Sequence, residues 1–212
     1  MIFFLFKRYK GIEYIKMFEY HSSPIDWCES NFEVSYFIAE FYNTLTTLPM
    51  LYVAYLLWTP SQKIYACIVF GIGIGSMIFH STLNLFGQLF DEFCLVLYVC
   101  YLTKCPYFIP ICGLIFVYPK INAYVLISTA FFIIVAWYYN VLYLHIPLKT
   151  VTGSRLIMQK PLILIVFCVI AGALWIMDIA CINGMHLHFI WHIFSSYILY
   201  LSCGVSIQLR TK

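Results

Sequence analysis

The sequence predicts an all-α, polytopic membrane protein in which a bundle of seven transmembrane helices forms a single domain. Of its 212 residues, 63% are hydrophobic and only 10% are charged, and the mean hydropathy is +0.89. Soluble domains carry about 25% charged residues, so this chain has more apolar surface than a soluble core can hold. Apolar stretches of roughly 20 residues recur from residue 34 to residue 209, and each is long enough to cross a bilayer.

The elements follow from these apolar stretches in order. Residues 1–33 are interpreted as a lumenal segment, of which residues 1–20 lie at the membrane interface. The helix bundle then occupies 34–209, with spans over 34–58, 64–85, 89–104, 107–119, 121–144, 162–182 and 188–209. The fourth span is short and is bracketed by Pro106, Pro110 and Pro119, so the fourth and fifth helices alternatively share 107–145 through a tight turn.

The distribution of basic residues predicts the orientation. With seven helices, the amino terminus is lumenal and the carboxyl terminus is cytosolic, because most basic residues in the connections then face the cytosol. These residues are Lys63, Lys104, Lys149, Arg155, Lys160, Arg210 and Lys212. Lys120 and the basic amino-terminal tail oppose this assignment. The net charge of +3 lies mostly in loops and tails, so it indicates topology and not a nucleic-acid partner.

A group of histidines inside the apolar helices predicts a metal site. His188 and His192 are four residues apart, so they share one face of a helix. An odd number of helices brings them to the same end of the bundle as His80, near the end of the second helix. Three imidazoles with one open position are typical of catalytic zinc, which lowers the pKa of its bound water to about 7. Imidazole also suits haem or copper, and the residues alone leave these open.

Two further polar residues are candidates for catalysis. Asp91, at the start of the third helix, is either a general base or a carboxylate that orients a histidine ring. Ser76 lies one turn before His80 on the same face of its helix. It either donates a hydrogen bond to a developing oxyanion or bonds to its own helix backbone.

An acidic cluster before the first helix is a candidate calcium site. Asp26, Glu29, Asn31 and Glu40 offer hard oxygen ligands at irregular spacing, which suits calcium. The competing interpretation is an amino-terminal helix cap. A cap does not explain Glu40, which lies inside an apolar stretch.

The remaining motifs favour structural roles. The nine cysteines are scattered without C-x-x-C pairs, but Cys28 and Cys181 lie near predicted helix ends and could meet in an oxidising compartment. The three alternate glycines at 71, 73 and 75 look like a nucleotide-binding loop, yet no strand precedes them. Close helix packing is the better interpretation of these glycines.

Three blocks of the sequence resemble the alkaline ceramidases, within a superfamily of seven-helix membrane hydrolases that includes the progestin and adipoQ receptors. Together they cover about half of the chain, and their joint order and spacing are specific. They are 25–31 (IDWCESN) with 38–44 (IAEFYNT), 75–83 (GSMIFHSTL) with 88–92 (QLFDE), and Trp175, Asp178 and Cys181 with 188–192 (HFIWH).

The resemblance implies a specific set of roles. Zinc would be held by His80, His188 and His192, with Asp91 and Ser76 in catalytic roles. Calcium would be held on the lumenal side, by Asp26, the Trp27 carbonyl, Glu29, Asn31 and Glu40. A disulfide would join Cys28 to Cys181.

The resemblance has a limit. The family usually continues Asp-Glu with Leu-Pro-Met, whereas Phe93 and Cys94 follow here. Residues 105–170 match no family pattern and are shorter than the family norm, so the preferences for acyl chain and sphingoid base do not follow.

The function expected from these observations is zinc-dependent hydrolysis of the amide bond of a ceramide-type lipid. The products would be a sphingoid base and a fatty acid, and the membrane would be that of the endoplasmic reticulum or Golgi. The alternative is a receptor-like member of the superfamily with little turnover. A transporter or channel would need polar residues along the fourth to sixth helices, where the sequence has almost none.

Overall fold

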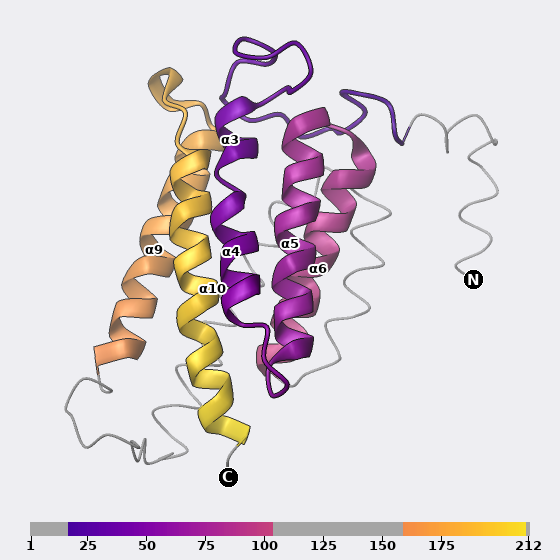
Figure 1. The fold of residues 1–212 in the computed structure, drawn as a ribbon. Coiled ribbons are helices and arrows are strands. Elements are labelled where there is room, and N and C mark those ends of the chain that lie inside the picture. The colour runs from indigo at the N-terminus through magenta and orange to yellow at the C-terminus, as the bar shows by residue number, and fades with distance from the viewer. Residues whose placement is uncertain (1–16, 104–158, 211–212) are drawn as a thin grey trace, which may run out of the picture.

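The computed structural model describes residues 17–103 and 159–210, with side chains over 17–102 and 166–202. Within these residues the regular structure is helical, apart from one isolated bridge between Ser35 and Ile38. The helices run roughly parallel to one another (Figure 1). They are α3 (Phe41–Leu45), α4 (Leu48–Leu56), α5 (Lys63–Thr82), α6 (Leu85–Thr103), α9 (Gln159–Ile179), the short 3-10 helix η4 (Ile182–Gly184) and α10 (His188–Arg210).

The first expected helix, 34–58, is wrong in both its start and its continuity. Residues 34–40 are not helical, and the helical part is divided into α3 and α4. Pro49 lies in the first turn of α4, where its missing N–H costs least, so it favours a new helix start. The hydroxyls of Thr46 and Thr47 bond back to carbonyls of α3 and compete with a continuous helix at this point.

The connection between α5 and α6 is shorter than expected. Leu83 ends α5 in the left-handed region with φ 51°, and α6 begins at Leu85 and not at residue 89. Asn84 explains the early start, because its Oδ1 accepts the Gly87 N–H at 2.6 Å, as an N-cap side chain does. The second helix, expected over 64–85, is α5.

The last two expected helices, 162–182 and 188–209, correspond to α9 and α10 within three residues at each end. The fourth and fifth, 107–119 and 121–144, lie outside the described residues. Among the described residues, two helices are long and apolar enough to cross a membrane: α5, with a mean hydropathy of 1.7, and Leu85–Leu102 of α6, with 1.5.

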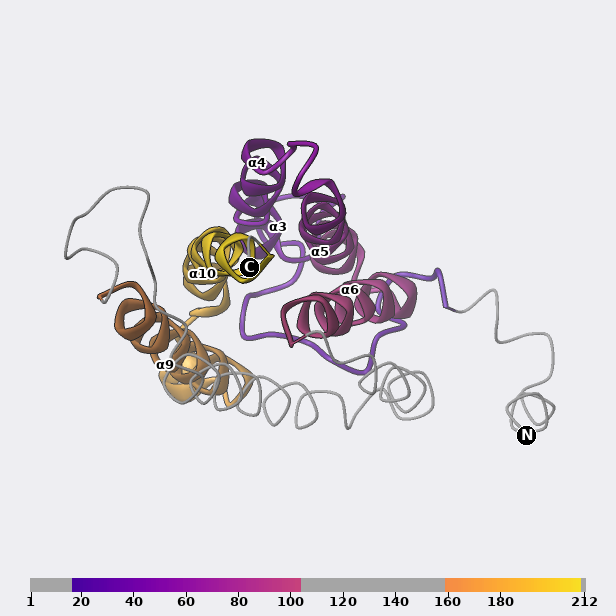
Figure 2. The ribbon, with the colours of Figure 1, turned by 90° about the horizontal axis from the view of Figure 1, so that it is seen from below.

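The described helices form an arc in the order α9, α10, α3 with α4, α5 and α6 (Figure 2). The main core lies between α4, α5 and α6, where Met50, Tyr65, Val69 and Ile72 are almost fully buried, and Leu199 of α10 joins it. This packing leaves the carboxyl end of α5 and the amino ends of α6 and α10 together at one end of the bundle (Figure 1).

Glycine lets α5 and α6 approach closely next to that end. A Cβ atom on Gly75 would lie 2.7 Å from the backbone nitrogen of Asp91, and one on Gly87 would lie 2.7 Å from that of Phe79. Both positions require glycine, because backbone atoms cannot move aside as a flexible side chain can. Among the three alternate glycines, Gly75 therefore places α6 against α5 next to Ser76, which agrees with the packing interpretation.

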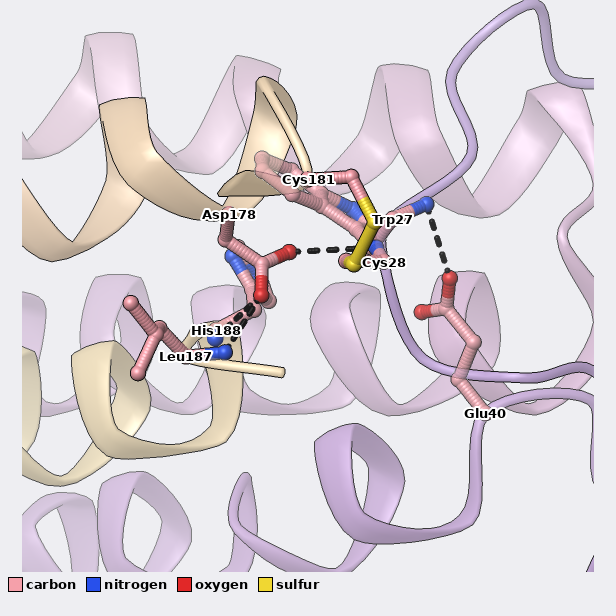
Figure 3. Close-up of a disulfide and its surroundings, with 7 residues drawn as sticks. All are labelled: Trp27, Cys28, Glu40, Asp178, Cys181, Leu187 and His188. Atoms are coloured by element: carbon pink, nitrogen blue, oxygen red, sulfur yellow. Dashed lines mark hydrogen bonds between the residues drawn. A yellow bond between two sulfur atoms is a disulfide. The ribbon is translucent and has the colours of Figure 1, made fainter. Parts of the chain in front are cut away.

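The segment before α3 crosses this end of the bundle. His21 and Ser23 donate backbone hydrogen bonds to the last residues of α5, and Glu40 donates one to the carbonyl of His80. A disulfide between Cys28 and Cys181, with Cα atoms 5.1 Å apart, ties the segment to the chain after α9 (Figure 3). The segment is thereby held over the same end of the helices as the predicted metal site.

Candidate metal centre

Three buried histidines meet at the end of the bundle that the segment covers. His80 comes from the last turn of α5, and His188 and His192 come from the first turns of α10. One ring nitrogen from each lies within 4.8 Å of the other two, and the three residues are at most 2% exposed. The prediction that these three rings converge is confirmed. The spacing of the nitrogens fits one metal ion.

The hydrogen bonds of His192 determine which of its nitrogens is available to a metal. Nδ1 lies 3.0 Å from the carbonyl oxygen of Asn43, and a carbonyl can only accept. Nδ1 therefore carries the proton, and Nε2 keeps its lone pair. The Thr46 hydroxyl, also 3.0 Å from Nδ1, donates to the Tyr42 carbonyl and so accepts from the same ring N–H.

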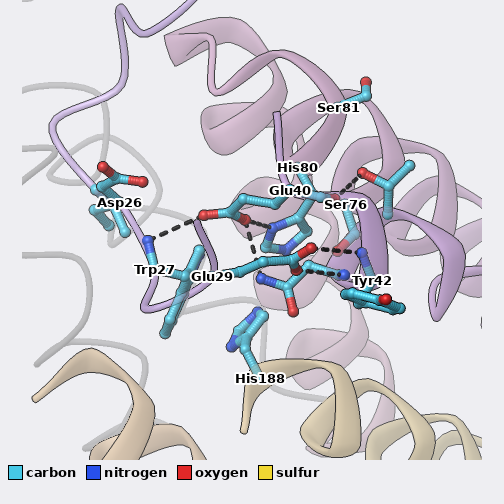
Figure 4. Close-up of polar contacts among 12 residues, drawn as sticks. Asp26, Trp27, Glu29, Glu40, Tyr42, Ser76, His80, Ser81 and His188 are labelled. Carbon is cyan, nitrogen blue, oxygen red and sulfur yellow. Dashed lines mark hydrogen bonds and ion pairs between the residues drawn. The ribbon is translucent and has the colours of Figure 1, made fainter. Parts of the chain in front are cut away.

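His80 is held in the same way by a carboxylate. Its Nδ1 donates to Oε2 of Glu40, a residue with 0% exposure (Figure 4). The other oxygen, Oε1, accepts the backbone N–H of Trp27 at 3.1 Å. An ionised carboxylate only accepts, so this pair also leaves Nε2 of His80 with a lone pair. A carboxylate on the far nitrogen is the usual partner of a zinc-binding histidine.

His188 is fixed by stacking. Its ring lies 3.6 Å from the Trp27 ring, centroid to centroid, with 24° between the planes, and it also stacks on Trp191. Its Nδ1 is buried without a hydrogen-bond partner among the described residues. Buried polar atoms are rarely left unpaired, so this nitrogen supports a metal at the centre of the three rings.

Ser76 lies beside a histidine ring, and Asp91 adjoins Ser76. The Ser76 hydroxyl lies 3.4 Å from Nε2 of His192 and is also a hydrogen-bonding neighbour of the Asp91 carboxylate. Asp91 is 9% exposed, and its Oδ1 has no hydrogen-bond partner within the described part of the chain. An acceptor oxygen is therefore available next to Ser76, whose hydroxyl contacts His192.

The predicted calcium ligands lie beside this centre, and the carboxylate oxygens among them already accept hydrogen bonds. Both oxygens of Glu29 accept backbone N–H groups of α3, from Tyr42 at 2.6 Å and Asn43 at 2.8 Å, so Glu29 does cap that helix (Figure 4). Burial raises the pKa of Glu29 above its ordinary value, while these two bonds act to lower it. The exposed Asp26 accepts from the Asn31 amide.

These bonds do not exhaust the capacity of the cluster to bind a cation. Each carboxylate oxygen has two lone pairs, and the hydrogen bonds above use one or two of them. Oδ1 of Asn31 is buried and has no partner among the described residues. An amide oxygen is a ligand that calcium accepts, so the donor set fits a hard cation.

Comparisons with known proteins identify the family of this chain. The family model described as ceramidase matches residues 19–212. This chain belongs to the ceramidase family. Alkaline ceramidase 1 of Homo sapiens is 31% identical over 220 residues, which cover 85% of this chain and 80% of the human protein. Alkaline ceramidase 1 of Mus musculus is 32% identical over 85% of this chain and 77% of the mouse protein. The alkaline ceramidase YPC1 of Saccharomyces cerevisiae is 40% identical over a shorter stretch, 37% of this chain and 28% of the yeast protein.

The structure of this ceramidase-family chain adds residues that sequence reasoning did not place at the centre. Asn43 and Thr46 hold His192, and Glu40 contacts His80 directly in addition to any role as a calcium ligand. The Asn-x-x-Thr sequence after Glu40 was a weak signal, since small polar residues in an apolar stretch need partners. Which histidine they would contact depends on how α3 packs against α10.

Proposed function

We propose that this ceramidase-family chain is a zinc-dependent amidohydrolase that cleaves a ceramide-type lipid to a sphingoid base and a free fatty acid. The observation that carries the proposal is the convergence of His80, His188 and His192 within 4.8 Å, beside the buried carboxylate of Asp91. The alkaline ceramidases to which the chain is similar support the substrate class.

Zinc is the metal that this donor set favours. Haem takes its axial imidazoles on opposite faces of a ring, so three clustered nitrogens do not suit it. Three neutral imidazoles with an open position are the ligand set of catalytic zinc. When bound, zinc would polarise the amide carbonyl and make a water nucleophilic at neutral pH. His80, His188 and His192 would hold it, with the first and last through Nε2.

Asp91 and Ser76 would carry out the proton transfer and the stabilisation of the oxyanion. Asp91 accepts a proton from the attacking water as the water oxygen bonds to the amide carbon. As the carbon–nitrogen bond breaks, Asp91 returns that proton to the amine of the leaving sphingoid base. The Ser76 hydroxyl, between Asp91 and His192, donates a hydrogen bond to the carbonyl oxygen as negative charge develops on it.

A calcium ion at the adjacent cluster would stabilise the segment over the centre. Its ligands would be Asp26, the Trp27 carbonyl, Glu29, Asn31 and Glu40. One support is Oδ1 of Asn31, which has no hydrogen-bond partner in the described part of the chain. The other is Glu40, whose carboxylate contacts both the segment and His80. Calcium would therefore act on the zinc centre through structure.

The protein would be a seven-helix, multi-pass protein of the endoplasmic reticulum or Golgi, with a lumenal amino terminus and a cytosolic carboxyl terminus. In support, α6 ends and α9 begins at the same end of the bundle, which a seven-helix topology requires (Figure 1). The disulfide lies at the opposite end, with the metal centre, which suits an oxidising lumen.

Hydrolysis of a ceramide by the purified chain in detergent, combined with zinc analysis, tests this function. We expect wild type to bind one zinc and release sphingoid base. Asp91→Asn should keep the zinc and lose about 10²–10⁴-fold in kcat, because only the proton transfer is removed. His192→Ala should lose both the bound zinc and the hydrolytic activity. His21 is exposed, so His21→Asn should keep both.

Two outcomes would contradict the proposal. Bound zinc without any release of sphingoid base, across a panel of ceramides, would favour the receptor-like alternative. Equal zinc content in wild type and His192→Ala would place the metal elsewhere.

A further inference from the structure

The amino end of α10 has no side-chain cap of its own. The helix begins at His188, and the residue before it is Leu187, whose side chain cannot accept a hydrogen bond. The first backbone N–H groups of a helix have no partner within the helix, and burying them unpaired is unfavourable. His188 is 2% exposed, so water has little access to these N–H groups as a hydrogen-bond partner. The chain must supply an acceptor from another element.

Asp178, near the end of α9, is that acceptor. Its Oδ1 accepts the N–H of Leu187 at 2.5 Å and the N–H of His188 at 3.0 Å. Its Oδ2 accepts the N–H of Cys28 at 3.2 Å, which lies in the segment before α3 (Figure 3). The residue is 1% exposed. One carboxylate therefore joins α9, the start of α10 and the segment.

These bonds determine where the His188 ring lies. The N–H that Asp178 accepts belongs to His188 itself, so the bond fixes the backbone to which the imidazole is attached. The bond to Cys28 holds the neighbouring Trp27, whose ring stacks on the same imidazole at 3.6 Å. The negative charge of Asp178 at the amino end of α10 also interacts favourably with the positive end of the helix dipole. The backbone and the ring face of His188 thus depend on one side chain.

We propose that Asp178 is a positioning residue that sets the place of His188 in the metal centre. The inference rests on the proposed metal-binding function of the three histidines. Asp178 contacts neither the metal nor the substrate in this proposal. Its effect is on the geometry and the affinity of the centre.

Cobalt binding to the metal-depleted full-length chain in detergent tests the proposal, because the visible d–d bands of Co²⁺ report ligand geometry without any turnover. Asp178→Leu removes the acceptor and should weaken cobalt binding about 10–100-fold, with a shifted band at saturation. Asp178→Asn keeps one carbonyl oxygen for Leu187 and His188. Asp178→Asn should show the wild-type band and a cobalt affinity between those of wild type and Asp178→Leu.

The matched control breaks the covalent tie and leaves the carboxylate in place. The double variant Cys28→Ser, Cys181→Ser keeps Asp178 and its bonds to α10, so it should show the wild-type cobalt bands. A merely stabilising role for Asp178 would leave the band of the folded, saturated Leu variant unchanged. Where the Leu variant does not elute as a single folded species, Asp178→Asn decides the matter through its affinity.

The outcomes separate this inference from the proposed function. The positioning role would be overturned, and the metal centre left intact, if Asp178→Leu bound cobalt with the wild-type affinity and bands. If only Asp178→Asn folds, wild-type cobalt affinity in that variant would overturn the role in the same way. Failure of the wild-type chain itself to bind cobalt would overturn both. Weakened binding and shifted bands in Asp178→Leu, with the wild-type band and an intermediate affinity in Asp178→Asn, would support the role.

Discussion

The hydroxyl oxygen of Thr46 lies 3.0 Å from Nδ1 of His192, so a residue in the break between α3 and α4 holds a ring on α10. At this break the Thr47 N–H donates to the Thr44 carbonyl, whereas in a continuous α-helix it would donate to the Asn43 carbonyl. The interruption therefore contributes to the centre, since it leaves the Asn43 carbonyl available to His192.

Thr46→Val tests this contact with little change in side-chain volume. We expect zinc affinity to fall by about tenfold, the low end for loss of a group that orients a metal ligand, because Asn43 still accepts from His192. Competition with a zinc chelator measures the zinc affinity of each variant. Thr59→Val, at an exposed threonine, is the control and should keep the wild-type affinity. An unchanged affinity in Thr46→Val would mean that Asn43 alone orients the ring.

Glu40→Gln separates the two roles of Glu40. A role in holding His80 predicts that zinc binding weakens, about 10–100-fold, even in calcium-free buffer. A role only as a calcium ligand predicts that zinc affinity in that buffer stays at the wild-type value. Titrating zinc into both proteins with and without calcium distinguishes these results. The exposed Glu33→Gln is the control for loss of a carboxylate in the same segment.

Gly75→Ala tests the close approach of α5 and α6. Its Cβ would lie 2.7 Å from the Asp91 backbone nitrogen, so the helices must separate, at a cost of about 1–3 kcal/mol in stability. A shift of Asp91 by about 1 Å can reduce a rate by on the order of 100-fold. Thermal unfolding and ceramide hydrolysis measure the two effects. Gly172→Ala on α9 is the control, because no described residue lies within 4 Å of its Cβ position, and it should unfold at or above the wild-type temperature.

Loss of the disulfide should lower stability more than loss of another cysteine. Cys28 and Cys181 are 153 residues apart, and removing a native bond of this kind typically costs about 2–5 kcal/mol. We expect Cys28→Ser, Cys181→Ser to unfold at a lower temperature than wild type, and reductant to affect only wild type. Cys67→Ser, at an exposed free cysteine, is the control. Equal unfolding temperatures with and without reductant would contradict a stabilising bond.

Much of the centre could be predicted from the sequence because its signals are local. Two histidines four residues apart lie on one helix face whatever surrounds them, and ionisable residues within apolar stretches are costly enough to indicate a function. The same reasoning identified Asp91 and Ser76 as neighbours of His80. The expected start of α6, residue 89, is four residues too late, because the Asn84 cap that starts the helix at Leu85 is a polar contact and leaves no mark in the apolar pattern.

The sequence by itself determined the helical class, the family and the three histidines, because hydropathy, short-range spacing and motif order are properties of the linear chain. Only the tertiary structure decided which nitrogens of His80 and His192 keep a lone pair, and that Asp178 fixes the start of α10. The His192 partner Asn43 lies 149 residues away, and the Cys28 partner of Asp178 lies 150 away. Such pairings depend on how whole helices pack, and no local periodicity encodes that packing.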